Sequence, residues 1–256
     1  MQNAQQDDPL DGYFGESVAA GYDDPSDPAN DPVTIGRTVG LLAELAEGGP
    51  VLELAVGTGR LAAPLAQRGL HVRGIEMSGA MAARVPDKPG GERVQVTVGD
   101  MTTTRVAGEF SLVFLAFNTL NNVTTQDGQV AVFANAAAHL RPGGRFLVEV
   151  GVPPLRRMPP GQDTVPFTIE ADGAGGGYAG FDRLDVVTQQ FTSNHVRVEE
   201  GMGRFREIPF RYVWPAELDL MARMAGMVPE HRWSDWRRKA FTAKSESHVS
   251  VWRRPA

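Results

Sequence analysis

Short apolar runs alternate with amphipathic segments through residues 33–152. Runs rich in strand-forming residues occupy positions 51–56, 70–75, 94–98, 110–117 and 145–150. Apolar residues recur at helical spacing in segments 35–46, 61–66 and 130–140, which lie before or between these runs. A capping-box sequence at Thr124 to Asp127 predicts the start of the last of these helices. The recurring strand, helix, strand order predicts an α/β fold with a parallel, doubly wound sheet.

The pattern changes after Val152. Prolines and glycines punctuate residues 153–177, and residues 184–191, 195–199 and 204–213 then alternate apolar and polar positions, as antiparallel strands with one wet face do. Pro215 and Gly226 bracket a helix, and segments 231–236 and 248–252 read as strands that complete the first sheet. We therefore expect an antiparallel β cover inserted before the last helix.

These patterns divide the chain into four expected segments. They are an acidic N-terminal arm with a lid helix (1–32), an α/β core (33–152), the β cover (153–213), and the last helix with the sheet-completing strands (214–256). In the first segment, Leu10, Tyr13, Phe14 and Val18 share one face at helical spacing, which predicts a short helix over residues 10–20. Core packing and a role in a site are equally open for these aromatic residues.

The stretch Val51 to Arg60 reads as strand, glycine turn and helix start. Gly57 and Gly59 reach positive φ cheaply and let a ligand approach the backbone, although a glycine turn alone also serves merely to reverse the chain. Three acidic residues, Glu53, Glu76 and Asp100, end three successive predicted strands. Parallel neighbours bring such residues to one carboxyl edge, where open α/β sheets bind ligands.

Several motifs together resemble the class I S-adenosylmethionine-dependent methyltransferases. They are Glu53-Leu-Ala-Val-Gly57-Thr-Gly59-Arg60, Gly74-Ile-Glu76-Met-Ser78 with Met81, Gly99-Asp100-Met101, and Arg141-Pro-Gly143-Gly144 before a strand. The resemblance implies a Rossmann-like, seven-stranded sheet whose last strand is antiparallel. It implies S-adenosylmethionine as cofactor, and S-adenosylhomocysteine as product.

By this resemblance, Glu76 accepts hydrogen bonds from the two ribose hydroxyls, and Asp100 accepts one from the adenine amino group. Met101 gives its backbone N–H, Met77 packs on the adenine, and Gly57 and Gly59 make room for the methionine half. The full set of implied cofactor-binding residues is Glu53, Ala55, Gly57, Arg60, Glu76, Met77, Met81, Gly99, Asp100, Met101 and Ala116. Ala55 departs from the family, which has the first of its three glycines there, and alanine is a mild change.

A nicotinamide-binding Rossmann domain is the main alternative for the same glycines. Its fingerprint allows the alanine found at Ala62, three positions after Gly59. A dinucleotide needs its pyrophosphate cradled by glycines and a helix N-terminus, whereas a sulfonium cofactor has no phosphate and is bound by acids. Asp100 therefore favours the sulfonium cofactor.

The turn after the fourth strand, Phe117-Asn118-Thr119-Leu120, lies by topology beside the transferred methyl group. DNA and protein-glutamine methyltransferases carry Asn/Asp-Pro-Pro-Tyr/Phe there, so base or amide methylation is disfavoured. The likeness to small-molecule N-methyltransferases of antibiotic pathways, acting on amino sugars and lincosamides, implies Tyr13, Tyr22 and Phe117 as catalytic residues. Substrate-contacting candidates are Phe14, Asn118, Asn121 and His195, although asparagines in loops commonly just satisfy turns.

We therefore expect methyl transfer to the amine of a small molecule, such as an antibiotic precursor, by direct in-line displacement. An amine needs only to arrive neutral, whereas a hydroxyl acceptor needs a base or metal that the motifs do not provide. Small-molecule O-methylation and a non-catalytic S-adenosylmethionine-binding module are the alternatives.

Composition limits the remaining classes of function. The 256 residues, 42% hydrophobic, suffice for one core with additions, and the net charge of −6 without a basic run argues against a nucleic-acid partner. No apolar run approaches a membrane span, and the absence of cysteine agrees with a cytoplasmic protein. No spacing such as H-x-x-x-H predicts a metal, and His71, His139, His231 and His248 are expected to be structural or on the surface. A homo-oligomer remains open.

Overall fold

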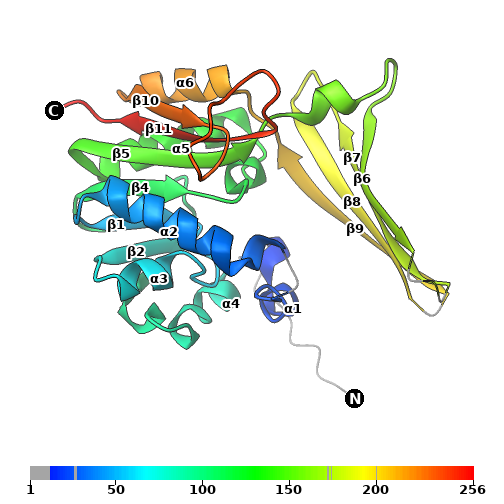
Figure 1. The fold of residues 1–256 in the computed structure, drawn as a ribbon, viewed down its shortest axis with the longest axis horizontal. Helices are drawn as coiled ribbons and strands as arrows, with labels where there is room; N and C mark the ends of the chain where they lie inside the picture. Colours follow the sequence, from blue (N-terminus) through cyan, green and yellow to red (C-terminus); the bar gives the residue numbers. More distant parts are fainter. Residues whose placement is uncertain (1–11, 26–27, 172, 174, 200) are drawn as a thin grey trace.

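The computed structural model describes residues 12–25, 28–171, 173, 175–199 and 201–256. They form a seven-stranded sheet with helices on both faces and a four-stranded sheet that stands beyond the ends of its strands (Figure 1). The position of Leu10, which opens the predicted N-terminal helix, lies outside the described residues.

The seven-stranded sheet has the expected topology. Its strands, in spatial order, are β10 (Val228–Trp233), β11 (Ser247–Arg253), β5 (Leu140–Gly151), β4 (Phe110–Leu115), β1 (Val51–Leu54), β2 (Val72–Glu76) and β3 (Gln95–Val98). Strands β5, β4, β1, β2 and β3 pair in parallel, whereas β11 pairs antiparallel with both β5 and β10. The predicted doubly wound sheet with an antiparallel last strand is therefore confirmed.

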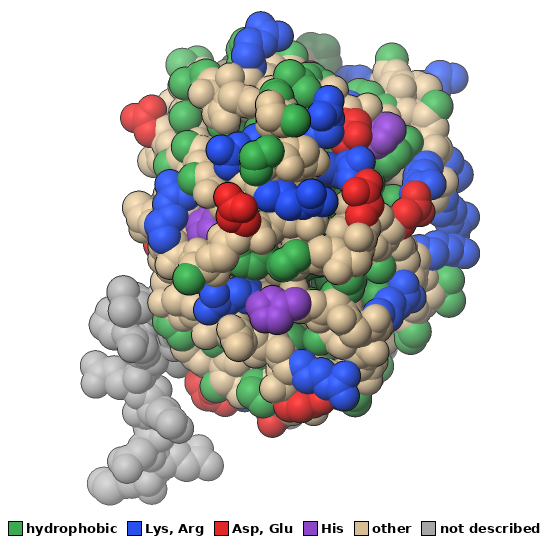
Figure 2. Space-filling model, turned by 90° about the vertical axis from the view of Figure 1, so that its left-hand side faces the viewer, with side chains coloured by type: hydrophobic (Ala, Val, Ile, Leu, Met, Phe, Trp, Pro, Cys, Tyr) green, Lys and Arg blue, Asp and Glu red, His purple; other side chains and the backbone are tan. Residues whose placement is uncertain are grey.

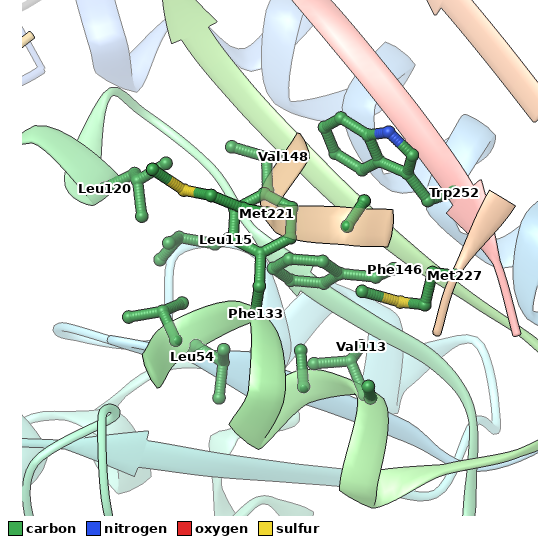
Figure 3. Close-up of a cluster of buried hydrophobic side chains, with 14 of the residues drawn as sticks. Leu54, Val113, Leu115, Leu120, Phe133, Phe146, Val148, Met221, Met227 and Trp252 are labelled. Atoms are coloured by element: carbon green, nitrogen blue, oxygen red, sulfur yellow. The ribbon is translucent and has the colours of Figure 1, made fainter. Parts of the chain in front are cut away.

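Two helical layers bury the sheet. Helices α2 (Pro32–Ala46) and α3 (Ala62–Gln67) pack on one face, and α5 (Gln126–His139) and α6 (Pro215–Met224) pack on the other. Strand β4 is buried on both sides, because Val113 and Leu115 enter the α5 and α6 layer while Leu112 and Phe114 enter the α2 and α3 layer. Figure 3 shows the first of these cores, in which Phe133 of α5 lies against Phe146 of β5 and Trp252 of β11.

Short elements occupy the connections between strands and helices. They are the helices α1 (Glu16–Ala19) and α4 (Gly79–Ala82) and the 3-10 turns η1 (Gly12–Phe14), η2 (Pro28–Asn30), η3 (Val85–Asp87), η4 (Gly91–Arg93), η5 (Thr119–Asn122) and η6 (Pro154–Arg157). The single helix predicted over residues 10–20 is thus η1 and α1, separated by Gly15. Ser78 caps α4 by accepting a hydrogen bond from the Met81 N–H at 3.0 Å.

The four-stranded sheet, which we call the cover, is an antiparallel meander. Its strands are β6 (Thr164–Ala171), β7 (Gly177–Leu184), β8 (Gln190–Glu199) and β9 (Met202–Arg211). The strand predicted over residues 184–191 is wrong, because Asp185 to Gln189 form the turn between β7 and β8. Strands β6 and β7 were missed, since the glycines at 173–177 made their surroundings resemble a loop.

Two predicted boundaries also need correction. The cap of α5 is Thr125, whose hydroxyl accepts a hydrogen bond from Gly128 N, and not Thr124. Strand β5 begins at Leu140, before the Pro-Gly-Gly sequence that was expected to precede it. Its register on β4 shifts between Leu140 and Arg145, and from Arg145 the strand runs beside β4 to the same edge as its neighbours, ending at Gly151.

The histidines outside the cover have the structural surroundings expected of them. His248 is fully buried in β11, and burial, with nearby Arg232, lowers its pKa to about 4. His139 accepts a hydrogen bond from Val106 N at 3.0 Å, and His231 stacks on Trp233. His71 precedes β2 instead of lying within it.

The end of the molecule opposite the cover shows no gathering of one charge. In Figure 2, basic, acidic and hydrophobic side chains are mixed over this face. Of the helices that the structure describes, none is long and apolar enough to cross a membrane.

Candidate functional site

The acidic residues predicted from the sequence meet at the carboxyl edge of the sheet. The parallel register places Glu53 in β1, Glu76 at the end of β2, and Asp100 just beyond β3. Glu76 and Asp100 line the same cavity of about 470 Å³. The geometry on which the cofactor prediction depends is therefore present.

The glycine turn after β1 is held by Glu76. One carboxylate oxygen of Glu76 accepts a hydrogen bond from Gly57 N at 2.7 Å, and the other accepts one from Ser78 N at 3.0 Å. Gly57 and Gly59 have φ of 57° and 84°, and a Cβ on Gly59 would press against Val85 at 3.0 Å. Glu76 thus joins the turn to the start of α4.

Ala55 is more unusual than its sequence suggests. Its φ is 52°, in the left-handed region that disfavours a residue with a Cβ. The substitution that sequence reasoning treated as mild therefore carries backbone strain. Ala55 directly follows β1 and Ala116 directly follows the neighbouring strand β4, so a small side chain lies just beyond the end of each strand.

Glu53 is a buried acid with an unused oxygen. It is 5% exposed, and its Oε2 atom has no hydrogen-bond partner among the described residues. Burial raises the pKa of Glu53 well above its usual range, the Arg60 guanidinium opposes this rise, and Glu76 adds to it. A cationic group placed here would satisfy the free oxygen.

The cavity of about 470 Å³ holds most of the predicted cofactor residues. Its lining includes Ala55, Glu76, Met77, Gly99, Asp100 and Met101. Met77 is 47% exposed, and a hydrogen bond from Thr102 N at 2.7 Å fixes the Asp100 carboxylate. Thr125 and Gly128, at the start of α5, form part of the opposite wall.

The N-terminal segment (residues 12–25 and 28–30) is fastened over this cavity. Phe14 O accepts a hydrogen bond from the Ser78 hydroxyl at 2.7 Å, and Glu16 pairs with Arg84. Asp23 accepts a hydrogen bond from Thr58 at 2.8 Å and pairs with Lys88. These contacts join the segment to both the glycine turn and α4.

The aromatic residues of the N-terminal segment form one cluster. Tyr13 and Phe14 line the 470 Å³ cavity, with ring centroids 5.0 Å apart, and Tyr22 packs edge-on against Phe14 at 6.2 Å. Arg206 of the cover lies 4.7 Å above the Tyr13 ring. Tyr13 therefore connects the N-terminal segment to the cover, while Tyr22 supports the cluster through Phe14.

The turn after β4 is strained and firmly held. Phe117 and Asn118 both adopt left-handed conformations, with φ of 62° and 57°. Phe117 N donates to the Glu149 carboxylate at 2.7 Å, and the Asn118 side-chain oxygen accepts from Gly151 N at 2.5 Å. Both anchors lie at the end of β5, so this strand sets the conformation of the turn.

Phe117 and Asn118 face different cavities. Phe117 lines a cavity of about 250 Å³, together with Arg60, Ala116, Glu149 and Trp236, and the Arg60 guanidinium lies 4.5 Å from its ring centroid. Asn118 and Asn121 line a larger cavity of about 680 Å³ beneath the cover. A single turn therefore separates the core side of the site from the cover side.

The cavity beneath the cover, which we call the cover cavity, is lined by both aromatic and polar side chains. Phe167, Phe191, Phe210 and Tyr212 form its cover wall, and the Phe191 and Phe210 rings stack at 4.9 Å. Its polar groups include Asp182 and Ser193 from the cover, with Arg157 and Lys244 at the rim. Its size and lining suit a small molecule with both apolar and charged parts.

Two of the predicted site residues lie behind the cavities. Met81 is 2% exposed, beneath the glycine turn, where its terminal carbon lies 3.6 Å from a Cβ built on Gly57. His195 lies on the inner face of the cover, where it hydrogen bonds to Ser193. Met81 therefore acts on the site through the glycine turn, and His195 acts on it through Ser193.

Sequence reasoning missed Glu149 and Asp182. Burial raises the pKa of Glu149, while hydrogen bonds from Phe117 N and Trp236 and the charge of Arg60 oppose the rise. Glu149 lies two residues before the end of β5, near the edge at which Glu76 ends β2, so the argument used for the other strands extends to it. Asp182 lies in β7, a strand that the pattern did not predict.

Within the part of the chain that the structure describes, no group of three or more His, Cys, Asp or Glu side chains is placed to hold a metal ion. The carboxylates of the edge instead point at a strand-end crevice with a glycine turn and a covering segment. This arrangement defines a binding site for an adenosine-type cofactor in an open α/β sheet.

Comparison with known proteins agrees with this class. Residues 51–144 match the family described as a methyltransferase domain. The CcbJ methyltransferase from Streptomyces caelestis is 35% identical and superposes with a TM-score of 0.81, over 93% of this chain and 96% of that one. The cypemycin N-terminal methyltransferase of a Streptomyces species is 25% identical over 214 residues, 80% of this chain and 83% of that protein.

A shorter match is to YqeM of Bacillus subtilis, 31% identical over 110 residues. It covers 42% of this chain and 44% of that protein, so the chain spans less than half the length of this curated relative. The long match to CcbJ, together with the matching domain, identifies the family: the chain belongs to the S-adenosylmethionine-dependent methyltransferases. Its cofactor is S-adenosylmethionine.

Proposed function

We propose that this enzyme methylates the amine of a small molecule, such as an antibiotic precursor. The observation that carries the proposal is the position of the cover cavity. Asn118 lines this cavity, whereas the preceding residue, Phe117, lines the smaller cavity on the core side of the turn. The acceptor binds in the cover cavity and meets the cofactor at this turn.

The 470 Å³ cavity takes the adenosine half of the cofactor. Glu76 accepts hydrogen bonds from the ribose hydroxyls, and Asp100 accepts one from the adenine amino group. The Met101 backbone N–H donates a hydrogen bond to the adenine ring. Met77, whose side chain is half exposed on the cavity wall, packs on the adenine. A carboxylate that accepts hydrogen bonds from neutral hydroxyls remains charged, so these contacts are strong for their size.

The methionine half lies along the glycine turn, between Ala55 and Ala116. Its ammonium group donates a hydrogen bond to the unpartnered oxygen of Glu53, and its carboxylate forms an ion pair with Arg60. The unpartnered Glu53 oxygen supports this assignment, because a buried carboxylate oxygen without a donor is costly unless a ligand completes it.

S-Adenosylmethionine supplies a methyl group on a positively charged sulfur, which an incoming nucleophile displaces in line. The residues of this chain contribute mainly orientation. Tyr13 and Phe117 are assigned as the aromatic groups beside the reacting atoms, where their π faces favour a cationic amine, and Tyr22 is assigned to support this cluster through Phe14. Phe14, Asn118, Asn121 and His195 are assigned to the acceptor side.

The names of related proteins support nitrogen as the acceptor atom. The cypemycin enzyme is named for methylation at an N-terminus. Proteins that share the fold at lower identity include a sugar N-methyltransferase from a Streptoalloteichus species and a glycopeptide N-methyltransferase. Likeness at that level shows the fold alone, so the chemistry of the cover cavity has to decide the acceptor.

Matched pairs of acceptors test the proposal. Each pair presents an amine and its hydroxyl twin on the same frame: a methyl aminopentoside with its pentoside, and an alanyl peptide with its lactyl counterpart. We expect the amine, and not its hydroxyl twin, to gain a methyl group, detected by mass spectrometry. Methylation of the hydroxyl twins, and not of the amines, would overturn the proposal.

A further inference from the structure

The inner face of the cover carries a connected set of polar side chains that the cofactor does not use. Asp182 of β7 is the cross-strand neighbour of Ser193 in β8. Ser193 lies 3.2 Å from one ring nitrogen of His195, and the other ring nitrogen lies 2.5 Å from the Tyr178 hydroxyl. The set runs from the cover cavity towards the tip of the cover.

The carboxylate end of this set is the end that reaches the cover cavity. Asp182 and Ser193 both line the cavity, whereas His195 and Tyr178 lie behind them, with their rings stacked. Phe167, which also lines the cavity, packs edge-on against His195 at 5.6 Å. Its ring occupies the place where a Cβ on Gly180 would lie, so only glycine allows this packing.

The hydrogen bonds can all point towards the carboxylate. Tyr178 donates to His195, and His195 donates to Ser193 from its other nitrogen, which leaves the Ser193 hydroxyl proton free to point at its cross-strand neighbour Asp182. Donors aligned in this way stabilise the ionised carboxylate and fix its direction, and each bond strengthens the next. Asp182 therefore presents its carboxyl group to the cover cavity, beside the set of hydrogen-bonded side chains that ends at Ser193.

We propose that Asp182 is the group that binds the ammonium form of the acceptor and removes its proton before methyl transfer. The proposal rests on the proposed amine acceptor and deepens it: the acceptor is an aliphatic amine, which is protonated near neutral pH. An aromatic amine or an amide nitrogen is already neutral and has no use for such a carboxylate. Ser193, His195 and Tyr178 are positioning residues.

The proton and electron counts balance without another reactant. The R–NH3+ group gives one proton to Asp182, leaving R–NH2 and a neutral carboxylic acid. The nitrogen lone pair then forms the N–C bond, and the C–S bond breaks with its electrons staying on sulfur. The product is R–NH2+–CH3, and Asp182 releases its proton to water when the product leaves.

The surrounding charges are compatible with this role. Burial raises the pKa of Asp182, which makes it a better base, while the Ser193 hydrogen bond, His195 and Arg157 oppose the rise. From the other elements, Arg206 of β9 faces His195, and Lys244 and Glu246 line the cover cavity. Tyrosine is the weaker candidate for the base, because a neutral phenol does not hold an added proton.

A neutral variant and its pH profile test the proposal, using whichever amine of the matched pairs the wild type methylates. Near pH 7, Asp182→Asn should lower kcat/KM by about 100-fold, the size typical of losing a general base. Above a pH of about 10, where aliphatic amines are largely neutral, the loss should shrink to about threefold or less. The matched control is Glu207→Gln, an exposed carboxylate on the other face of the cover.

The positioning residues have their own readout. Ser193→Ala should lower kcat by about tenfold, shift the acid limb of the pH profile, and leave KM for the amine little changed. Ser193→Thr, which keeps the hydroxyl, should restore both. Binding of S-adenosylhomocysteine, measured by calorimetry, should be unchanged in all variants, which shows that each variant is folded.

The outcomes separate this proposal from the proposed function. If the wild type methylates only hydroxyl twins or nothing in the panel, the amine acceptor itself fails, and the role of Asp182 fails with it. If the wild type methylates amines but Asp182→Asn keeps the wild-type profile, or loses activity equally at every pH, only the role of Asp182 is overturned. The same holds if Glu207→Gln loses as much as Asp182→Asn.

Discussion

The cofactor side and the cover side of this site are built in opposite ways. On the cofactor side, Glu76 and Asp100 follow directly on neighbouring parallel strands, so the short local sequence places them. On the cover side, the polar set is assembled from two antiparallel strands of a separate sheet, and the cavity closes only where that sheet meets the core. The first is recognisable as a motif, and the second exists only after folding.

The attachment of the cover to the core gives the largest expected effect. Arg211, the last residue of β9, is 3% exposed and bonds to Glu217 of α6 at 2.7 Å, to Gln129 of α5 and to Gln189. Arg211→Met leaves Glu217 without its cation, and losing one partner of a buried pair costs about 3 to 5 kcal/mol. Thermal unfolding should show a clear fall in Tm.

The same variant sharpens the comparison between the two sides. Because the cofactor cavity is built mainly on the core, we expect Arg211→Met to retain S-adenosylhomocysteine binding in calorimetry below its Tm. Arg204→Met, an exposed arginine earlier in β9, is the control and should leave Tm unchanged. A parallel loss of cofactor affinity in Arg211→Met would show that the two sides are not independent.

Glu76→Gln addresses the cofactor side. The change removes a charged acceptor that holds Gly57 N and Ser78 N and receives the ribose hydroxyls in our assignment. Hydrogen bonds to charged groups contribute about 1.5 to 3 kcal/mol, so the Kd for S-adenosylhomocysteine should rise by about 10- to 150-fold. Calorimetry measures this, with Glu92→Gln, an exposed acid before β3, as the control.

An unchanged Kd in Glu76→Gln would contradict the assignment of the ribose. The hydroxyls would then have another acceptor, and the adenosine would have to lie elsewhere along the edge. The melting temperature of the variant without ligand separates this result from simple loss of the glycine turn.

The pKa of Glu53 predicts a pH dependence of cofactor binding. Burial raises this pKa well above its usual value of about 4.3, so the free protein keeps Glu53 protonated over a window above that value. Because the folded protein binds this proton more tightly than the unfolded chain does, the proton stabilises the folded state at low pH. This stabilisation is lost as the pH rises through the raised pKa. A bound ammonium reverses the preference, so binding should release a proton and tighten by up to tenfold per pH unit within the window.

Calorimetry in two buffers of different ionisation enthalpy measures that proton. Glu53→Gln should bind more weakly at the upper end of the window and should lose the pH slope. A slope that persists in this variant would assign the proton to another group. The cover-side carboxylate Asp182 is the internal comparison, because its replacement should leave the slope intact.

These predictions concern features that the sequence reveals to different degrees. The strands ending at Leu54, Glu76 and Val98 were predictable because each is a short apolar run stopped by a glycine or an acid. The sheet order followed from the strand, helix, strand alternation, which leaves few topologies. Most residues of the cofactor cavity could therefore be predicted from the sequence alone.

The cover was predicted as a kind of structure but not strand by strand. Its long strands expose both faces for much of their length, so apolar residues such as Ile169 at 80% exposure and Phe205 at 58% carry no information about a core. Conversely, the alternation over residues 184–191 is broken by the adjacent Val186 and Val187, and the segment spans a turn. Without one buried face to fix the period, alternation is a weak guide to strand position.

Backbone strain was also beyond sequence reasoning. Ala55 and Phe117 both adopt left-handed conformations, and Phe117 is anchored by the hydrogen bond from its N–H to Glu149. Residues that prefer other conformations occupy both positions, so no local signal announces them.

Ala55→Gly gives the smallest expected effect. Removing the Cβ relieves the strain at φ of 52°, which should raise the free energy of unfolding by about 0.5 to 1 kcal/mol after the entropy of the unfolded glycine is counted. Chemical denaturation measures the change, and Ala66→Gly, inside α3, is the control and should be destabilising. Destabilisation by Ala55→Gly would mean that the turn is not strained.

The structure of the enzyme with S-adenosylhomocysteine and a matched amine tests the central claim most directly. We predict the ribose hydroxyls on Glu76, the adenine amino group on Asp100, and the sulfur beside the Phe117–Asn118 turn, with the amine approaching from the cover cavity. A nucleoside bound away from Glu76 and Asp100, or an amine outside the cover cavity, would contradict the account.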